Sequence, residues 1–295
     1  MLLHITVPKP YDFASSVRDH GWIALAPFRW HDDDSALQRV EQLRDGKVVL
    51  LTVTAADANE AVRVSIDVQD DGDITQTEQA EVLEKVRWML KLDEDFADFY
   101  ALVARDPELA AKLIGGRGRL LRSPTLFEDV VKTICTTNTN WAQTKGMVAR
   151  LVARVGDSYP LDPERHAFPT PEQVAAAGEE VFQSDIRLGY RNAYVLQLAR
   201  ELAEGRRDLE ALKTTSLPLK ELKKELKGIM GVGDYAAHTL MMILGRYDEV
   251  AVDSELRSFV GKKYGAGGAL TEKEMVAIYE GWGRWKYLAY WFDAS

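Results

Sequence analysis

The chain has 295 residues, 46% of them hydrophobic, and a formal net charge of −9. This length is enough for two modest domains or one large one, with a sizeable apolar core. Its only cysteine, Cys135, excludes an internal disulfide and an iron–sulfur cluster held by four cysteines. The sequence has no apolar run of 18 residues and no signal-peptide pattern, so we expect a soluble, cytoplasmic protein without membrane contacts.

The negative charge is concentrated in the N-terminal third. Residues 1–100 hold 10 Lys and Arg against 20 Asp and Glu, whereas the remaining 195 residues hold 27 and 26. Residues 117–154 contain seven basic side chains and two acidic ones. This segment predicts a basic surface, although an ordinary solvated helix face is an equal alternative.

Residues 1–75 are predicted to be rich in β-strands. Lys47–Thr54 is typical of a buried strand, and Ala61–Val68 alternates between apolar and polar side chains. Residues 55–60 between them are predicted to form a hairpin loop.

From residue 76 the apolar spacing becomes helical. Helices are predicted near 77–91, 93–105, 107–113, 125–139, 142–156, 172–183, 190–204, 219–227, 234–245, 254–263, 272–280 and 284–291. The predicted fold class is therefore α+β, with an antiparallel β domain at 1–75 followed by a mostly helical domain at 76–295.

Residues 220–245 predict two helices joined by a glycine turn. Gly228 ends the first helix, and Gly231 and Gly233 allow the backbone conformations of a tight hairpin before the second helix starts near Asp234. The free N–H groups and the dipole at the start of that helix suit a phosphate. An ordinary turn between two helices is the alternative.

Asp253 lies twenty residues beyond Gly233. A helix over 234–245 is about 18 Å long, and an extended segment of seven residues spans about 23 Å, so the chain can return to the hairpin. Asp253 also precedes a helix-like run and is a candidate N-cap. The two roles are compatible, since one carboxylate oxygen can cap while the other faces a ligand.

The hairpin and Asp253 together resemble the helix-hairpin-helix (HhH-GPD) DNA glycosylase superfamily, in particular its 3-methyladenine glycosylase II and 8-oxoguanine glycosylase branches. Other segments resemble it in the same order; they are 120–157, 168–177, 188–200 and 279–291. The resemblance implies a helical domain with two halves and a cleft, and a partner that is double-stranded DNA with a damaged base. It also implies a monomer, associated with the nucleoid in a bacterium.

The resemblance assigns catalysis to Asp253. Bifunctional relatives carry a lysine two residues after the second hairpin glycine, whereas this chain has Tyr235, so Schiff-base chemistry should be absent. Tyr235 and Trp282 are candidates for the pocket that holds the base; packing in the core is the alternative for such aromatics. No cofactor is expected, although the hairpin leaves room for a monovalent cation.

The resemblance also assigns residues that stabilise opened DNA. Gly231 and Gly233 would hold phosphate, Asn138 and Tyr190 would fill the gap left by an extruded base, and Arg191 would bond the base left opposite. Gln143 stands where one branch has a second arginine. A helix-end Asn138 and a packed Tyr190 beside a surface Arg191 are the alternatives.

The expected function is a monofunctional DNA glycosylase of base-excision repair that hydrolyses the N-glycosidic bond of a flipped damaged purine. Alkylated purines are favoured because of Tyr235. An 8-oxoguanine DNA glycosylase is the alternative, because of Asn138, Tyr190 and Arg191. A catalytically inactive module that binds lesions is the alternative outside enzymes.

Overall fold

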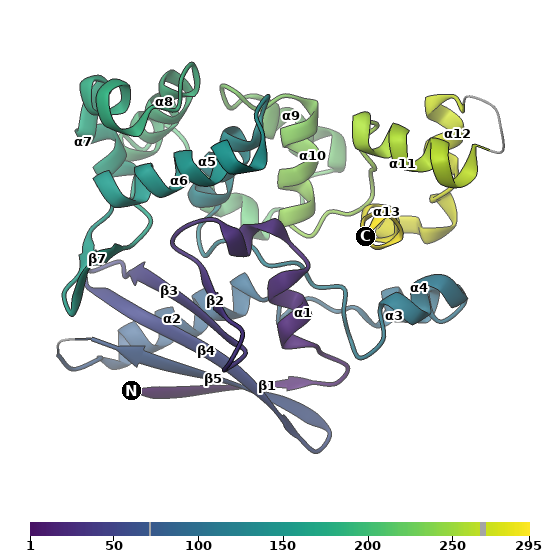
Figure 1. Ribbon diagram of the computed structural model, residues 1–295, viewed down its shortest axis with the longest axis horizontal. Coiled ribbons are helices and arrows are strands. Elements are labelled where there is room, and N and C mark those ends of the chain that lie inside the picture. Colours follow the sequence, from purple (N-terminus) through teal and green to yellow (C-terminus); the bar gives the residue numbers. More distant parts are fainter. Residues whose placement is uncertain (71, 266–269) are drawn as a thin grey trace. The chain divides into compact units, whose positions relative to one another are not determined.

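The computed structural model describes residues 1–70, 72–265 and 270–295 (Figure 1). The chain forms two compact units, each built from two segments. Unit 1 comprises Met1–Asp93 and Arg119–Thr214, and unit 2 comprises Glu94–Gly118 and Thr215–Ser295. The predicted fold class is confirmed, since an N-terminal antiparallel sheet is followed by mostly helical chain.

A five-stranded antiparallel sheet opens unit 1, in the order β1-β5-β4-β3-β2. Its strands are β1 (Leu2–Pro8), β2 (Arg29–His31), β3 (Ala36–Gln42), β4 (Val48–Ala58) and β5 (Ala61–Gln69). The alternation predicted for β5 is confirmed, because Val62, Val64, Ile66 and Val68 are all buried. One face of the sheet therefore forms part of the unit's core.

The hairpin between β4 and β5 is tighter than the sequence predicts. The predicted loop at 55–60 is wrong, because β4 continues to Ala58 and pairs there with Ala61. Only Asn59 and Glu60 remain in the turn, and Asn59 has a φ of 53°. Asparagine tolerates this left-handed conformation, which two-residue hairpin turns require.

Helices and a small hairpin complete unit 1. The helices are α1 (Phe13–Arg18), α2 (Gln76–Met89), α5 (Leu126–Thr136), α6 (Trp141–Val155), α7 (Pro171–Val181) and α8 (Arg191–Ala203). Shorter elements are η1 (Gly21–Ala24), β6 (Ser158–Tyr159), β7 (Asp162–His166), η2 (Phe182–Ile186) and η3 (Glu210–Thr214). α5 ends earlier than predicted, since Asn138 has a φ of 47° and cannot continue a helix.

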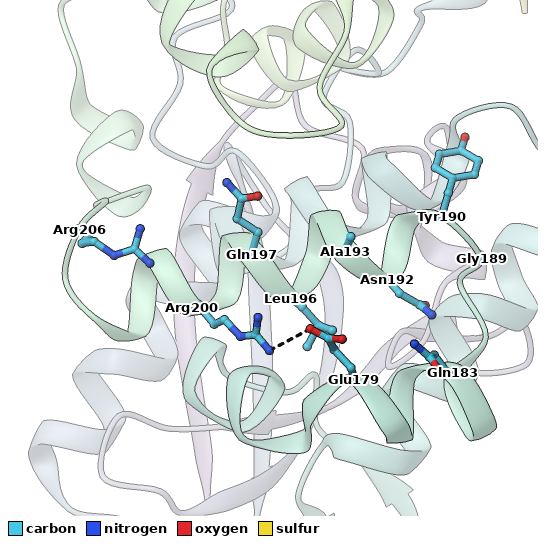
Figure 2. A pocket seen from close by; sticks show the side chains of 10 residues that line it. All are labelled: Glu179, Gln183, Gly189, Tyr190, Asn192, Ala193, Leu196, Gln197, Arg200 and Arg206. Atoms are coloured by element: carbon cyan, nitrogen blue, oxygen red, sulfur yellow. Dashed lines mark ion pairs between the residues drawn. The ribbon is translucent and has the colours of Figure 1, made fainter.

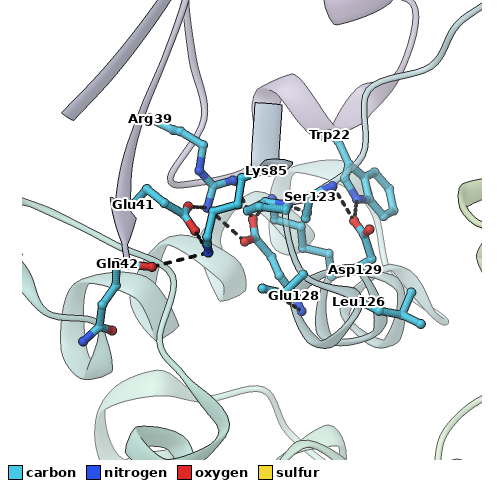
Figure 3. A network of polar contacts seen from close by, with 12 residues as sticks. Trp22, Arg39, Glu41, Gln42, Lys85, Ser123, Leu126, Glu128 and Asp129 are labelled. Carbon is cyan, nitrogen blue, oxygen red and sulfur yellow. Dashed lines mark hydrogen bonds and ion pairs between the residues drawn. The ribbon is translucent and has the colours of Figure 1, made fainter. Parts of the chain in front are cut away.

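Buried ion pairs tie α5 to the sheet (Figure 3). The Glu128 carboxylate on α5 lies 3.0 Å from Arg39 on β3 and 2.6 Å from Lys132. Arg39 also pairs with Glu41, which in turn pairs with Lys85 on α2. Burial alone would raise the pKa of Glu128, but Arg39 and Lys132 hold it below its usual value. Each buried charge thus has an opposite charge beside it.

Unit 2 is helical in the part that the structure describes. Its helices are α3 (Ala97–Val103), α4 (Pro107–Lys112), α9 (Leu219–Lys227), α10 (Asp234–Ile243), α11 (Ser254–Tyr264), α12 (Glu272–Ala277), η4 (Glu280–Trp285) and α13 (Lys286–Ala294). Aromatic rings of Phe96, Phe99, Tyr247 and Trp285 pack together in its core. Among the described residues, no helix is long and apolar enough to span a bilayer.

Candidate active site

The predicted helix-hairpin-helix is present as α9, a glycine turn and α10. Ile229 and Val232 are buried and anchor the turn, and the Val232 N–H donates to the Ile229 carbonyl at 3.0 Å. Gly231 has a φ of 91°, which only glycine adopts readily. Gly233 is the N-cap of α10 and has no side chain to cap it. Gly233 therefore supplies no capping oxygen to the first turn of α10.

The backbone at Gly233 is open to approach. A Cβ added there would meet no atom within 4 Å, and its φ of −86° is ordinary. The space in front of the first turn of α10 is thus open, because Gly233 has no side chain there. A phosphate oxygen can approach these amides closely, and the helix dipole favours its charge.

Asp253 is the N-cap of α11, as predicted. Its Oδ1 accepts a hydrogen bond from the Leu256 N–H at 2.8 Å. Its Oδ2 makes no hydrogen bond or ion pair with the residues that the structure describes. One oxygen therefore fixes the carboxylate, and the other remains available to stabilise positive charge on a ligand.

Two tyrosines of α13 lie near Asp253. Burial raises the pKa of Tyr287 and of Tyr290 well above the usual range, and the charge of Asp253 acts in the same direction on both. Tyr235 of α10 also contributes to both shifts. Asp253 and Tyr235 thus act electrostatically on the same two rings, and the return of the chain to the hairpin stays a prediction.

The rings of Tyr287 and Tyr290 stand almost perpendicular, at 87° with centroids 6.2 Å apart. Trp291 stacks on Tyr287. Tyr235 is 47% exposed, whereas Tyr287 and Tyr290 are buried. We name Tyr235, Tyr287 and Tyr290 the tyrosine cluster. Sequence patterns did not single out the α13 tyrosines, since aromatics at helical spacing are more often core.

The predicted pocket residue Trp282 has a different environment. Its ring lies 6.4 Å from that of Phe99, and it lines a shallow depression together with Ala101 and Arg105. No contact of Trp282 with Asp253 or with the tyrosine cluster is found among the described residues. Its part in a base pocket stays a prediction.

In unit 1 the structure brings Asn138, Tyr190 and Arg191 together. The Asn138 side-chain amide donates to the Tyr190 hydroxyl at 3.3 Å. The Tyr190 side chain is 52% exposed at the start of α8, and the Arg191 guanidinium lies 4.5 Å from the centroid of its ring. We name the pair Asn138 and Tyr190 the wedge.

Gln143 is an exposed residue in the first turn of α6, the helix that follows Asn138 in the chain. Its side-chain oxygen accepts a hydrogen bond from the Thr139 hydroxyl at 2.7 Å. Gln143 is therefore linked through Thr139 to the segment that presents Asn138. Its predicted contact with an opposite base stays a prediction.

A polar pocket of about 580 Å³ lies between α7 and α8. Figure 2 shows Tyr190 toward one end of this pocket and Arg206 toward the other. Arg200 and Glu179 form an ion pair of 3.6 Å across it.

In the described ranges of the chain, no three His, Cys, Asp or Glu side chains gather as the ligands of a metal ion would.

Several solved structures of DNA glycosylases have a similar fold. A 3-methyladenine DNA glycosylase from Archaeoglobus fulgidus has 22% identity and a TM-score of 0.77, over 99% of this chain and 97% of that one. An 8-oxoguanine glycosylase/lyase from Clostridium acetobutylicum, in complex with double-stranded DNA, has 20% identity and a TM-score of 0.70, over 100% and 96%. At these identities the likeness establishes the fold alone.

A third similar structure covers less of the chain. A DNA-3-methyladenine glycosidase from Bacillus halodurans has 22% identity and a TM-score of 0.52, over 68% of this chain and 88% of that one.

A family model gives the assignment that the solved structures do not. The model of the HhH-GPD superfamily base excision DNA repair proteins matches residues 131–283, just over half of the chain. The matched segment contains the wedge, the glycine hairpin, Tyr235 and Asp253. The protein therefore belongs to the HhH-GPD superfamily of base excision DNA repair proteins.

Proposed function

We propose that this protein is a monofunctional DNA glycosylase that hydrolyses the N-glycosidic bond of a flipped, damaged purine, with alkylated purines as the favoured substrates. The arrangement of Asp253 supports this most directly. One oxygen is fixed by the Leu256 amide, and the other is unbonded within the described chain, close to the tyrosine cluster.

Breaking the N-glycosidic bond places positive charge on the deoxyribose, as in other glycoside hydrolyses. The Asp253 carboxylate would stabilise that charge electrostatically and help to position the attacking water. Its anchored oxygen restricts the carboxylate before the substrate binds, so little reorganisation is needed.

The tyrosine cluster supports the preference for alkylated purines. Alkylation leaves a purine electron-poor or positively charged, and such a base stacks well on electron-rich rings. Both phenols are neutral at physiological pH, as tyrosines ordinarily are, and burial raises the pKa of Tyr287 and of Tyr290 further. A phenol at Tyr235 cannot form an imine with the sugar, so water is the expected nucleophile.

Double-stranded DNA is the proposed partner, and a monomer is the proposed form. The amides at the start of α10 would hold a phosphate near the damaged nucleotide. The exposed Tyr190 and its hydrogen-bonded neighbour Asn138 would fill the gap in the base stack. No cofactor enters the proposed reaction.

Oxidised guanine is the second candidate substrate. The hydrogen bond between Asn138 and Tyr190 favours this substrate. In the resemblance to the 8-oxoguanine branch, these two residues match the pair that fills the gap left by the extruded base. This candidate ranks below alkylated purines because Tyr235 stands where bifunctional relatives carry a lysine.

The test is base release from duplexes that contain 3-methyladenine, hypoxanthine or 8-oxoguanine, by wild type and by Asp253→Asn. Asparagine keeps the capping oxygen and removes the charge. We expect release of an alkylated purine by wild type and a loss of about 10²- to 10³-fold in the variant, with duplex binding retained. Borohydride should trap no covalent protein–DNA adduct.

Two results would contradict the proposal. Equal and negligible release by both proteins from every lesion, with binding retained, would indicate an inactive lesion-binding module. A borohydride-dependent adduct would show that an amine of the protein attacks the sugar, so that water is not the nucleophile.

A further inference from the structure

The Arg191 side chain is buried, with 6% of its surface exposed. Its Nε donates to the Ile134 carbonyl at 3.2 Å, and its Nη1 donates to the Leu188 carbonyl at 3.3 Å. Its Nη2 donates to the Thr137 carbonyl and, at 3.3 Å, to the Asn138 carbonyl. All three nitrogens of the guanidinium are therefore engaged within the protein.

These carbonyls lie near the end of α5 and in the turn before α8, and that of Ile134 also accepts from the Thr137 N–H and hydroxyl. Ile134, Thr137 and Asn138 lie at the C-terminal end of α5 and just beyond it, where helical carbonyls lack partners in the helix. Leu188 lies in the turn before α8. A cation is favourable at a helix C-terminus, and the planar fork of arginine can serve several acceptors at once.

The same contacts hold the wedge. Arg191 bonds the carbonyl of Asn138, whose φ of 47° lies in the left-handed region. Its guanidinium also lies against the Tyr190 ring, at 4.5 Å from the centroid. One buried side chain thus contacts both members of the wedge, and Asn138 and Tyr190 are hydrogen-bonded to each other.

We propose that Arg191 is a positioning residue that holds Asn138 and Tyr190 ready to enter DNA, and that it does not bond the base left opposite the extruded nucleotide. This inference rests on the proposed function. It replaces the role that the sequence resemblance gave to Arg191. Turning the guanidinium toward a base would break its hydrogen bonds to the carbonyls of Thr137, Asn138 and Leu188, in exchange for one base contact.

The inference has a consequence for specificity. A bidentate contact of arginine with one base discriminates against the others by about 5-fold to 150-fold. Without that contact, excision should depend little on which base lies opposite the lesion. We expect single-turnover rates of wild type to differ by less than about 5-fold between duplexes with A, C, G or T opposite an alkylated purine.

The variant Arg191→Lys tests the positioning role. Lysine keeps the charge but has one nitrogen, which cannot reach all four carbonyls. We expect excision to fall about 10-fold and by the same factor for all four opposite bases, because the wedge is displaced and no base contact is lost. The exposed Arg154 provides the matched control, so Arg154→Lys should behave as wild type.

A double-mutant cycle with Tyr190→Ala separates positioning from general destabilisation. If Arg191 acts through the wedge, Arg191→Lys should slow Tyr190→Ala little further, whereas a folding defect should slow both backgrounds equally. A loss in Arg191→Lys that is confined to one opposite base would overturn the inference, as would a strong opposite-base preference of wild type that Arg191→Lys abolishes. If wild type releases no base from any duplex, it is the proposed function that fails.

Discussion

At the scale of single residues, two buried titratable groups, Asp129 and His20, contribute to stability with opposite pH dependences. The Asp129 carboxylate accepts hydrogen bonds from the Trp22 indole at 2.7 Å and the Ser123 amide at 2.9 Å, and burial raises its pKa to about 6. His20 stacks on Trp22, and burial lowers its pKa to about 4.

The signs of the two contributions follow from linkage. The folded-state pKa of Asp129 exceeds its unfolded value of 3.8, so its contribution to stability is present below that value and is lost as pH rises through about 6. The folded-state pKa of His20 lies below its unfolded value of 6.5, so its contribution is lost as pH falls through about 4. Between pH 4 and 6 the two contributions oppose each other.

The variant Asp129→Asn should remove the pH-dependent contribution of the Asp129 carboxyl group. Its amide oxygen can still accept the hydrogen bonds from Trp22 and Ser123. We expect its free energy of unfolding to rise between pH 4 and 6 by about 2 kcal/mol more than that of wild type. Urea denaturation at several pH values measures the free energy of unfolding of both proteins. The other carboxylates contribute equally to both, so their contributions cancel in the difference. Parallel pH profiles for the two proteins would show that Asp129 titrates normally.

The sequence predicts part of the site at this scale. Asp253 and Gly233 are accessible to sequence reasoning because both act through local backbone geometry. Tyr287 and Tyr290 are not, since a tyrosine at helical spacing packs in a core as readily as in a pocket. The role of Arg191 depends on carbonyls of Ile134 and Asn138, which only the fold brings to it.

At the scale of elements, the hairpin offers two glycines with different requirements. Gly231 has a φ of 91°, whereas Gly233 has an ordinary φ and open space beside it. Gly231→Ala should therefore destabilise the protein by about 1–2 kcal/mol, and Gly233→Ala by only about 0.5 kcal/mol, because an N-cap prefers glycine to alanine.

Binding should separate the two variants further. A methyl group at residue 233 stands where a phosphate would approach the amides of α10, so Gly233→Ala should bind lesion-bearing duplex about tenfold more weakly. Thermal unfolding and fluorescence anisotropy measure the two effects independently. Unchanged affinity of a stably folded Gly233→Ala would refute the phosphate site.

Element boundaries show what local patterns leave undetermined. Helix start signals are reliable here, as for α7, where Thr170 and Gln173 form a capping box. The end of α5 is missed, because no residue type before Asn138 announces the left-handed turn. The predicted helix at 272–280 stops at Ala277, and Gly283 interrupts the segment before α13 with a φ of 55°.

At the scale of the whole molecule, the sequence predicts the fold class but not the two compact units. Periodicity shows where strands give way to helices, near residue 76. It does not show that residues 94–118 pack with the C-terminal helices. That association rests on contacts distant in sequence, such as the Lys112 ammonium, which donates to the carbonyls of Phe292 and Asp293.

The structure also limits the basic surface that residues 117–154 predict. Three of the seven basic side chains in this segment are buried; they are Arg119, Arg122 and Lys132. Lys132 pairs with Glu128, and Arg122 lies over the Trp88 ring and donates to a backbone carbonyl. These cations cannot meet DNA phosphates, so few charges in this segment remain for nonspecific attraction.

Binding to DNA should therefore depend only modestly on salt. Each phosphate neutralised by a lysine or arginine contributes about −0.9 to the slope of log K against log salt, and the uncharged amides of α10 contribute little. We expect a slope between about −2 and −4 for lesion-bearing duplex, measured by anisotropy from 50 to 200 mM salt. A slope steeper than about −6 would contradict this expectation, because it would require more cations at the phosphates than the exposed side chains of residues 117–154 supply.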